Sequence, residues 1–143
     1  MDQFWGLVLV VLGVLAWVGQ GTSWLLPDVA VRVGLSEAEA DVESVLWADI
    51  RGEAPWDALT LWTLPAAGLL LFLDVAAWAY LGLVGGGMYL YFGGRGLFQR
   101  LSMQRRGMRI GSPQSVRVAM VFLSVWAVIG IVTIAIAASD LPT

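Results

Sequence analysis

The sequence predicts an all-α protein: a small polytopic membrane bundle of four transmembrane helices, with an additional amphipathic acidic helix. Hydrophobic residues make up 59% of the 143 residues and charged residues only 13%, whereas soluble domains average about 45–50% and about 25%. Long apolar segments alternate with polar ones. Every basic residue is an arginine, and the arginines lie in or beside two polar segments.

We predict one integral membrane domain over residues 1–143, in a multi-pass protein of a cell membrane such as the bacterial inner membrane. A helix needs about 20 residues, at about 1.5 Å each, to cross the hydrocarbon layer. The predicted spans are residues 4–26, 57–73, 75–93 and 116–138, joined on one side by polar loops at 27–56 and 94–115.

Trp5 and Trp24 bracket the first span, at a separation that places both indoles at the membrane interfaces. No positively charged region precedes the span and no convincing cleavage site follows it, so we expect a retained helix and not a signal peptide. Gly6, Gly13 and Gln20 recur every seven residues, which predicts a face for close helix packing.

The segment from Asp28 to Asp57 holds eight of the eleven acidic residues. Ser36 and Glu39 fit a capping box, which predicts that an amphipathic acidic helix begins at Ser36. The apolar residues that follow at helical spacing are Val42, Val45, Leu46 and Ile50. We expect Gly52 to end this helix and Pro55 to stand in the first turn of the next one.

Asp74 interrupts an apolar segment of more than 35 residues. An acid at the centre of a span costs about 2.5–3.5 kcal/mol on insertion scales, whereas at an interface it costs little. We therefore predict that Asp74 lies in a turn between two crossings and caps a helix that begins at Val75. The alternative is one long helix, which would make three crossings.

Two patterns concern packing within the apolar segments. Thr60, Thr63 and Pro65 predict a kink whose freed carbonyl a threonine can satisfy. Gly82 and Gly86 form a GxxxG pattern, in which glycine lets two helices approach closely. We expect contacts within the bundle, with a dimer as the alternative.

A basic amphipathic segment follows the third span. Its arginines are Arg95, Arg100, Arg105, Arg106 and Arg109. They predict contacts with lipids, anionic headgroups included, or with the acidic surface of a partner; the alternative is that they only signal topology. Four spans place every arginine on one side of the membrane, which the positive-inside rule identifies as cytoplasmic.

The most suggestive polar site is formed by Arg51, Glu53 and Asp57, with Asp74 as a further candidate. Glu53 and Asp57 stand four residues apart, so they can share one helix face with Arg51 close enough to pair. Such carboxylates could bind a cation or relay protons. The alternative is a helix N-terminus enriched in acid because of the helix dipole.

The layout resembles that of small four-helix bacterial membrane proteins of the DoxX-like kind. The residues that carry the resemblance are Pro27 at the end of the first span and Arg51-Gly52 before the second. The resemblance implies a fold and no catalytic residues.

Histidine, cysteine and lysine are absent, which removes the side chains most used for general-base catalysis, thiol chemistry and metal ligation. We therefore predict a non-enzymatic membrane protein without cofactor, metal or nucleic acid, acting as an accessory subunit or homo-oligomer through contacts with lipids or a membrane partner. The alternatives are a small transporter or channel using Asp74 or the Glu53/Asp57 pair, and a lipid- or quinone-associated redox partner.

Overall fold

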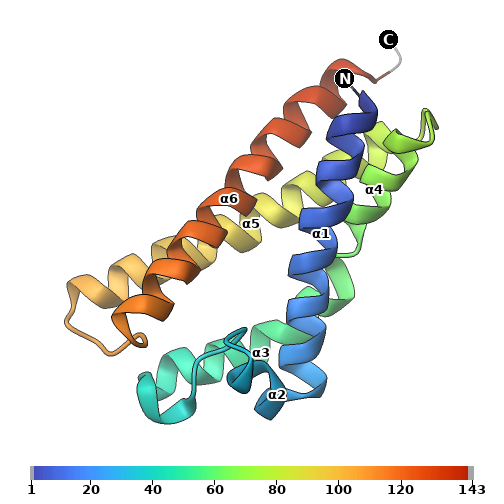
Figure 1. The fold of residues 1–143 in the computed structure, drawn as a ribbon. Helices are drawn as coiled ribbons and strands as arrows, with labels where there is room; N and C mark the ends of the chain where they lie inside the picture. The colour runs from blue at the N-terminus through green and yellow to red at the C-terminus, as the bar shows by residue number, and fades with distance from the viewer. Residues whose placement is uncertain (1, 142–143) are drawn as a thin grey trace.

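The computed structural model describes residues 2–141, and the backbone only of Asp2; this part of the chain is almost entirely helical (Figure 1). Its elements, in order, are α1 (Asp2–Leu25), α2 (Pro27–Arg32), the 3-10 helix η1 (Glu39–Asp41), α3 (Ser44–Thr60), α4 (Thr63–Phe72), α5 (Trp78–Arg105) and α6 (Pro113–Ser139). The predicted all-α helical fold is confirmed.

Two of the described helices are long and apolar enough to cross a membrane, over Gln3–Leu25 in α1 and Pro113–Ser139 in α6. Helix α5 has sufficient length, 28 residues, but its many glycines and terminal arginines lower its hydropathy. Helix α4 has only 10 residues, about 15 Å at 1.5 Å per residue. The first and last predicted spans therefore correspond to single apolar helices, and the second does not.

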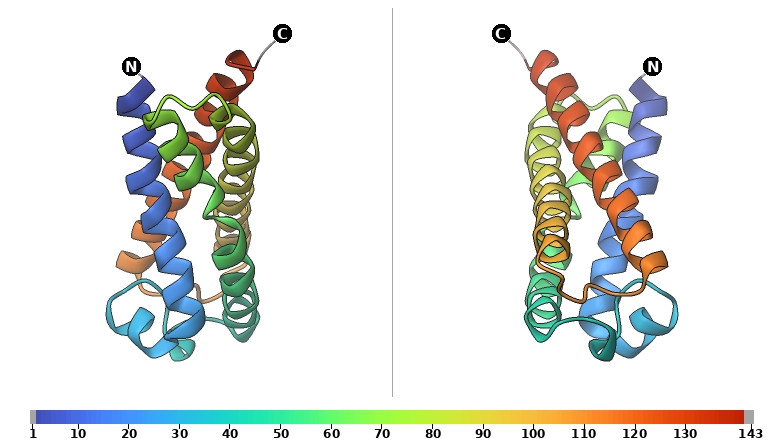
Figure 2. Two further views of the ribbon diagram at one scale, coloured as in Figure 1. Left: turned by 90° about the vertical axis from the view of Figure 1, so that its right-hand side faces the viewer. Right: turned by 90° about the vertical axis from the view of Figure 1, so that its left-hand side faces the viewer.

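Both termini lie at one end of the bundle, together with the turn between α4 and α5 (Figure 2). Helix α2, helix α3 and the connection from α5 to α6 lie at the opposite end, which we call the polar end. Helices α5 and α6 pack along their length, while α4 contacts both α1 and α5. Toward the polar end α1 and α6 diverge (Figure 1).

Small residues bring the helices close together. A Cβ on Gly86 would lie 3.0 Å from the carbonyl oxygen of Gly130, and a Cβ on Gly130 would lie 2.6 Å from that of Gly86. Gly82 faces Ala137 in the same α5–α6 contact. In lipid, where apolar burial drives helix association little, such close van der Waals contact is a main source of stability. The structure thus places Gly82 and Gly86 against a helix of the same chain.

Asp74 lies in a turn between two helices, and no continuous helix runs from α4 into α5. Its φ of 57° is left-handed, and its N–H donates to the carbonyl of Leu71 (3.1 Å) while that of Val75 donates to Leu70 (2.9 Å). These are the two hydrogen bonds of a Schellman motif. Asp74 therefore terminates α4, and the expected cap on a helix at Val75 is wrong, because α5 begins at Trp78.

A break separates α3 from α4 where the sequence predicts one span over residues 57–73. Pro65 has no N–H to donate to the carbonyl of Leu61, four residues earlier. The hydroxyl of Tyr89, on α5, lies 3.1 Å from that carbonyl oxygen. Thr63 donates instead to the carbonyl of Thr60 (2.9 Å). The kink is present, but a tyrosine from another helix satisfies the carbonyl that proline frees.

The acidic helix begins at Ser44 and not at Ser36. Val42 forms an isolated antiparallel bridge with Ile110, and the N–H of Glu43 donates to the carbonyl of Arg109 (2.9 Å). This pairing with the α5–α6 connection holds the chain extended up to the first residue of α3, and buries Val42. A contact distant in sequence thus overrides the local capping signal.

Helix α3 also continues past Gly52, where the sequence predicts its end, and contains Pro55 in its interior. Nothing lies within 4 Å of a Cβ built on Gly52, so packing does not require a glycine there. The segments predicted as an amphipathic helix and as the start of the second span are therefore one helix, which carries its acidic side chains toward α5.

The neighbouring glycines Gly93 and Gly94 test the importance of close α5–α6 packing. A Cβ on Gly93 would collide with the carbonyl oxygen of Leu123 and lie 2.8 Å from the nitrogen of Ala127, whereas one on Gly94 meets nothing within 4 Å. We expect Gly93→Ala to destabilise the bundle by about 1–3 kcal/mol, measured as thermal unfolding in detergent. Gly94→Ala, the control, should be neutral or stabilising by up to about 1 kcal/mol. Equal effects would contradict this packing.

Candidate functional site

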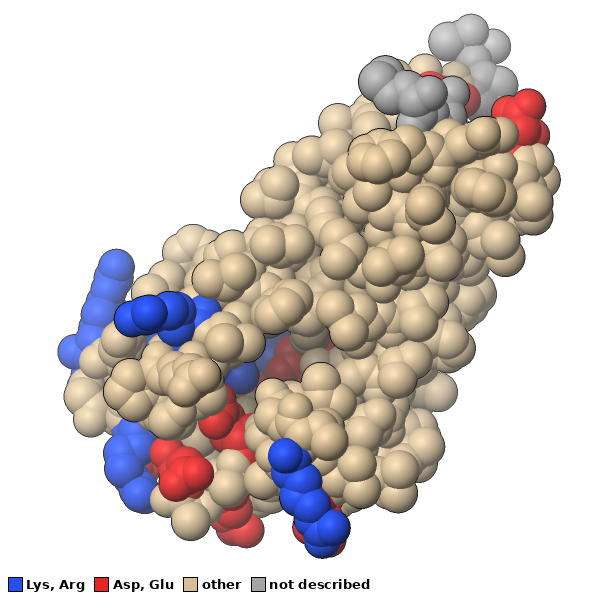
Figure 3. Space-filling view, viewed as in Figure 1, with Lys and Arg blue, Asp and Glu red and all other residues tan. Residues whose placement is uncertain are grey.

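Charged side chains gather at the polar end of the molecule. Figure 3 shows acidic and basic side chains together at that end, a middle region without charge on this face, and acidic side chains again at the opposite tip. The same view shows a recess near the polar end with charged atoms inside it. Such a separation of charged and uncharged surface is typical of a protein that lies across a membrane.

Arg95 on α5 joins two carboxylates of α3. Its guanidinium donates to Asp49 and to Glu53, both at 2.6 Å, and Gln99 donates to the other oxygen of Asp49 (2.8 Å). The hydrogen bond to Asp49 raises the pKa of Arg95. Burial raises the pKa of Glu53, although the charge of Arg95 opposes that shift. This cluster connects α3 to α5 at the polar end.

Arg51 does not pair with the carboxylates that the sequence places beside it. Its Nη1 donates to the carbonyl of Ser23 on α1 (2.6 Å), and its guanidinium carbon lies 6.0 Å from the centroid of the Trp47 ring. The expected ion pair is therefore wrong. Glu53 faces α5 and is bound by Arg95, so Arg51 serves instead to hold the end of α1 against α3.

Asp57 lies one turn beyond Glu53 on the same side of α3 and is 6% exposed. Its Oδ2 has no hydrogen-bond partner among the described residues. Asp74 lies at the opposite end of the bundle, in the turn between α4 and α5. The structure thus brings Glu53 and Asp57 together and separates them from Asp74. Within residues 2–141, no group of three or more acidic residues is placed to hold a metal ion.

The five arginines of the predicted basic segment have different environments. Arg95 and Arg100 lie on α5, which extends to Arg105, so half of the predicted loop is helix. Arg105 and Arg106 are exposed. Arg109 donates to the carbonyl of Ala40 (3.0 Å) and lies 3.6 Å from Glu43. Arg105 and Arg106 thus lie on the exposed surface as the sequence predicts, whereas Arg95 and Arg109 are engaged by acidic residues of the same chain.

A cavity of about 440 Å³ occupies the space where α1 and α6 diverge. Its apolar wall consists mainly of Leu15, Ala16, Gly19, Leu35, Ile50, Phe92, Val118, Ala119, Phe122, Leu123 and Trp126. Its polar wall consists mainly of Gln20, Ser23, Ser36, Glu37, Glu53, Arg100, Ser112, Gln114 and Ser115. The volume falls within the range of about 300–1,000 Å³ that is usual for small-molecule sites.

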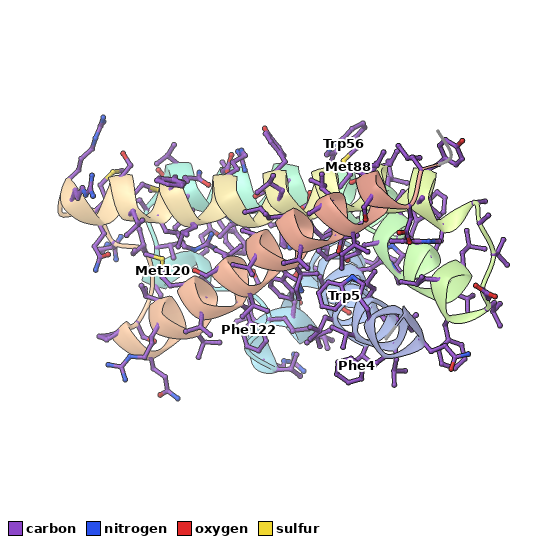
Figure 4. All side chains as sticks on the ribbon, turned by 90° about the horizontal axis from the view of Figure 1, so that it is seen from above. Phe4, Trp5, Trp56, Met88, Met120 and Phe122 are labelled. Carbon is purple, nitrogen blue, oxygen red and sulfur yellow. The ribbon has the colours of Figure 1, made fainter. Side chains whose placement is uncertain are left out.

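Aromatic side chains close the inner, apolar end of the cavity. The indole of Trp126 on α6 donates to the carbonyl of Leu12 on α1 (3.3 Å), and its ring lies 5.6 Å from that of Phe92 and 5.4 Å from that of Phe122. Figure 4 shows Phe122 on the side of α6 that faces α1, and Phe4 pointing away from the bundle. The cavity therefore ends where Trp126 bridges the two helices.

Glu37 and Arg100 stand at the polar end of the cavity. The carboxylate of Glu37 packs on Gly111, and a Cβ built on Gly111 would lie 2.8 Å from the Cδ of Glu37. Gly111 also has a φ of 115°. Both the close contact and the backbone conformation therefore favour glycine at this position. Burial raises the pKa of Glu37 and lowers that of Arg100. Each of these charged side chains is only partly exposed to water.

The sequence pattern named Arg100 as a basic residue of the membrane surface and gave no indication of the cavity. Glu37 lies between the two residues of the predicted capping box, Ser36 and Glu39, and Trp126 lies within the predicted last span; neither position by itself predicts a binding site. These residues come from three segments, and only the path of the chain brings them together.

Comparison of this chain with protein-family models, with curated proteins and with solved structures finds no match. The resemblance to DoxX-like proteins stays a prediction, and the function is inferred from the geometry.

The Arg95 cluster predicts a measurable coupling between α3 and α5. We expect Arg95→Gln to destabilise the protein in detergent by about 1–3 kcal/mol, because it removes two charge-assisted hydrogen bonds and leaves two carboxylates together. Arg105→Gln, on an exposed turn of the same helix, should change stability by less than about 0.5 kcal/mol. The double variant Arg95→Gln/Glu53→Gln should lose less than the sum of its single variants. Strict additivity would mean that the pair makes no contact.

Proposed function

We propose that this protein is a small, non-enzymatic, multi-pass membrane protein that binds an amphiphilic molecule of the lipid class in the cavity between α1 and α6. The cavity itself carries this proposal. It has an apolar wall to which the two apolar helices α1 and α6 contribute, and a polar end at the level of the charged surface, where Figure 3 shows a recess. A molecule with an apolar chain and a polar head has the same division.

Exposed apolar side chains support contact of α1 and α6 with lipid. On α1, Val11 is 57% exposed and Val18 54%; on α6, Val121 is 55% and Val128 56% exposed. In water, so much contiguous apolar surface would favour aggregation. In a bilayer these faces contact acyl chains, which gives a lipid a lateral route into the cavity between the two helices.

Four crossings, with both termini outside the cytoplasm, are part of the proposal. In this arrangement the end of α3 and α4 make the second crossing and the apolar part of α5 makes the third. The common position of both termini and the α4–α5 turn supports this topology, as does the location of the arginines toward the opposite end. The polar end then faces the cytoplasm.

The side chains around the cavity favour binding over catalysis. The sequence has no histidine, cysteine or lysine, and the cavity offers carboxylates, an arginine, hydroxyls and amides, which are suited to hydrogen bonding with a headgroup. Such a protein acts through its contacts, as a lipid-loaded accessory subunit or homo-oligomer.

The topology can be tested with single cysteines, because the natural chain has none. Ser44, Leu73 and Ser102 are exposed positions suited to replacement. In intact cells we expect an impermeant maleimide to label Leu73→Cys and to spare Ser44→Cys and Ser102→Cys, while all three react after lysis. Labelling of Ser44→Cys in intact cells would contradict four crossings and favour three.

Lipid occupancy of the cavity can be tested with two glycine variants of α1. Gly19 lines the cavity and has only Leu35 within 4 Å of a built Cβ, and Gly21 has nothing there and does not line it. Both positions accept a side chain, so both variants should fold. We expect native mass spectrometry to show bound lipid in the wild type and in Gly21→Phe, and much less in Gly19→Phe. Equal lipid retention by the two variants would overturn the proposal.

A further inference from the structure

Two opposite charges face the cavity without forming an ion pair with each other. Glu37 approaches from the connection between α2 and η1, and Arg100 approaches from α5. No ion pair joins them within the 4.0 Å that defines one among the described residues. A cavity with an anion and a cation at the same end that form no ion pair is an uncommon arrangement, because such groups normally pair when water is partly excluded.

Arg100 retains most of its hydrogen-bonding capacity. The one hydrogen bond that the structure gives it is a long one, from Nη1 to the carbonyl of Gly96 at 3.4 Å. Its Nε is buried and has no partner among the described residues. The neighbouring carboxylates Asp49 and Glu53 are already engaged by Arg95. Arg100 therefore offers a planar set of donors that no side chain among residues 3–141 uses.

We propose that the ligand carries a zwitterionic headgroup of the phosphoethanolamine class, with its phosphate bound by Arg100 and its primary ammonium bound by Glu37. This inference rests on the function proposed above. A guanidinium matches a phosphate with two parallel hydrogen bonds. A carboxylate accepts hydrogen bonds from an ammonium, and the nearby hydroxyls of Ser112 and Ser115 supply further acceptors.

The same side chains disfavour the other common headgroups. A phosphoglycerol headgroup can donate its hydroxyls to Glu37 but brings no positive charge to balance that carboxylate, whereas an ammonium supplies both the donors and the charge. A quaternary ammonium has no N–H to donate and is usually held by aromatic rings. The aromatic residues of this cavity, Phe92, Phe122 and Trp126, lie at its apolar end.

The apolar wall identifies the source of the headgroup as a lipid and not a free soluble phosphoester. Leu15 and Ala16 on α1 and Val118 and Phe122 on α6 continue from the polar end toward Trp126. A free headgroup would leave this wall without a partner, whereas acyl chains follow it and leave between the helices into the bilayer.

The experiment measures headgroup preference with defined probes. Purified protein is equilibrated with an equimolar mixture of dioleoyl lipids that bear phosphoethanolamine, phosphocholine or phosphoglycerol headgroups, and bound lipid is quantified by native mass spectrometry. We expect the wild type to bind the phosphoethanolamine lipid about ten times more than either of the other two lipids. This ratio corresponds to one charge-assisted hydrogen bond of about 1.5 kcal/mol. Soluble glycerophosphoethanolamine, added as a competitor, should not displace the lipid.

Variants of the two charged residues separate their roles. Glu37→Gln should abolish the preference for phosphoethanolamine over phosphoglycerol while lipid still binds, and Arg100→Gln should weaken all three lipids about tenfold. The matched controls are Glu39→Gln and Arg105→Gln, at exposed positions close in sequence; both should keep the wild-type preference. Because Glu37→Gln replaces a half-buried surface carboxylate by its isostere, its result stands even if Arg100→Gln does not fold.

Each outcome bears on one proposal. Lipid that binds in the wild type, is lost in Gly19→Phe and shows no headgroup preference would overturn the zwitterion inference alone. A preference that survives Glu37→Gln, or displacement by the soluble competitor, would overturn it as well. No retained lipid in the wild type would overturn the proposed function itself.

Discussion

The break between α3 and α4 imposes the constraint on which the rest of the structure depends. A helix interrupted within an apolar bundle leaves a carbonyl that no water can satisfy, so another part of the protein must supply a donor. Tyr89, fully buried on α5, places its hydroxyl 2.7 Å from the carbonyl oxygen of Gly13 and 3.1 Å from that of Leu61. Since one hydroxyl carries one hydrogen, the two carbonyls share this donor. A single side chain thereby connects α5, α1 and the break.

The two ends of the bundle have different packing because of this arrangement. Between the break and the end of the bundle that holds the termini, glycines allow the helix backbones to touch. A Cβ on Gly68 would lie 2.7 Å from the carbonyl oxygen of Gly6, and a Cβ on Gly85 would lie 2.7 Å from the backbone nitrogen of Leu64. Between the break and the polar end, ion pairs and a small apolar cluster around Leu46 and Met103 connect α3 to α5. Helices α1 and α6 are therefore held close near the termini and diverge toward the polar end.

The cavity and its two unpaired charges follow from that divergence. Trp126 spans the distance between α6 and α1 and limits how far the opening reaches into the bundle. Arg95 binds Asp49 and Glu53 of α3, so Arg100, five residues further along α5, has neither of these two carboxylates to bind. The resulting cavity has an apolar inner end and charged side chains at its polar end, and this division is the basis of the lipid-binding proposal.

The sequence by itself determined the features that depend on local chemistry. Hydropathy identified the helical, membrane-compatible character; the cost of an isolated acid in an apolar segment identified the turn at Asp74; and Pro65 identified the kink. Only the tertiary structure decided the partners of the charged residues and the start of α3. Arg51 reaches Ser23 and not Glu53, Val42 pairs with Ile110, and Glu37 and Arg100 meet at one cavity. The physical reason is that a turn or a break depends on neighbouring residues, whereas the partner of a long charged side chain depends on how distant segments are arranged in space.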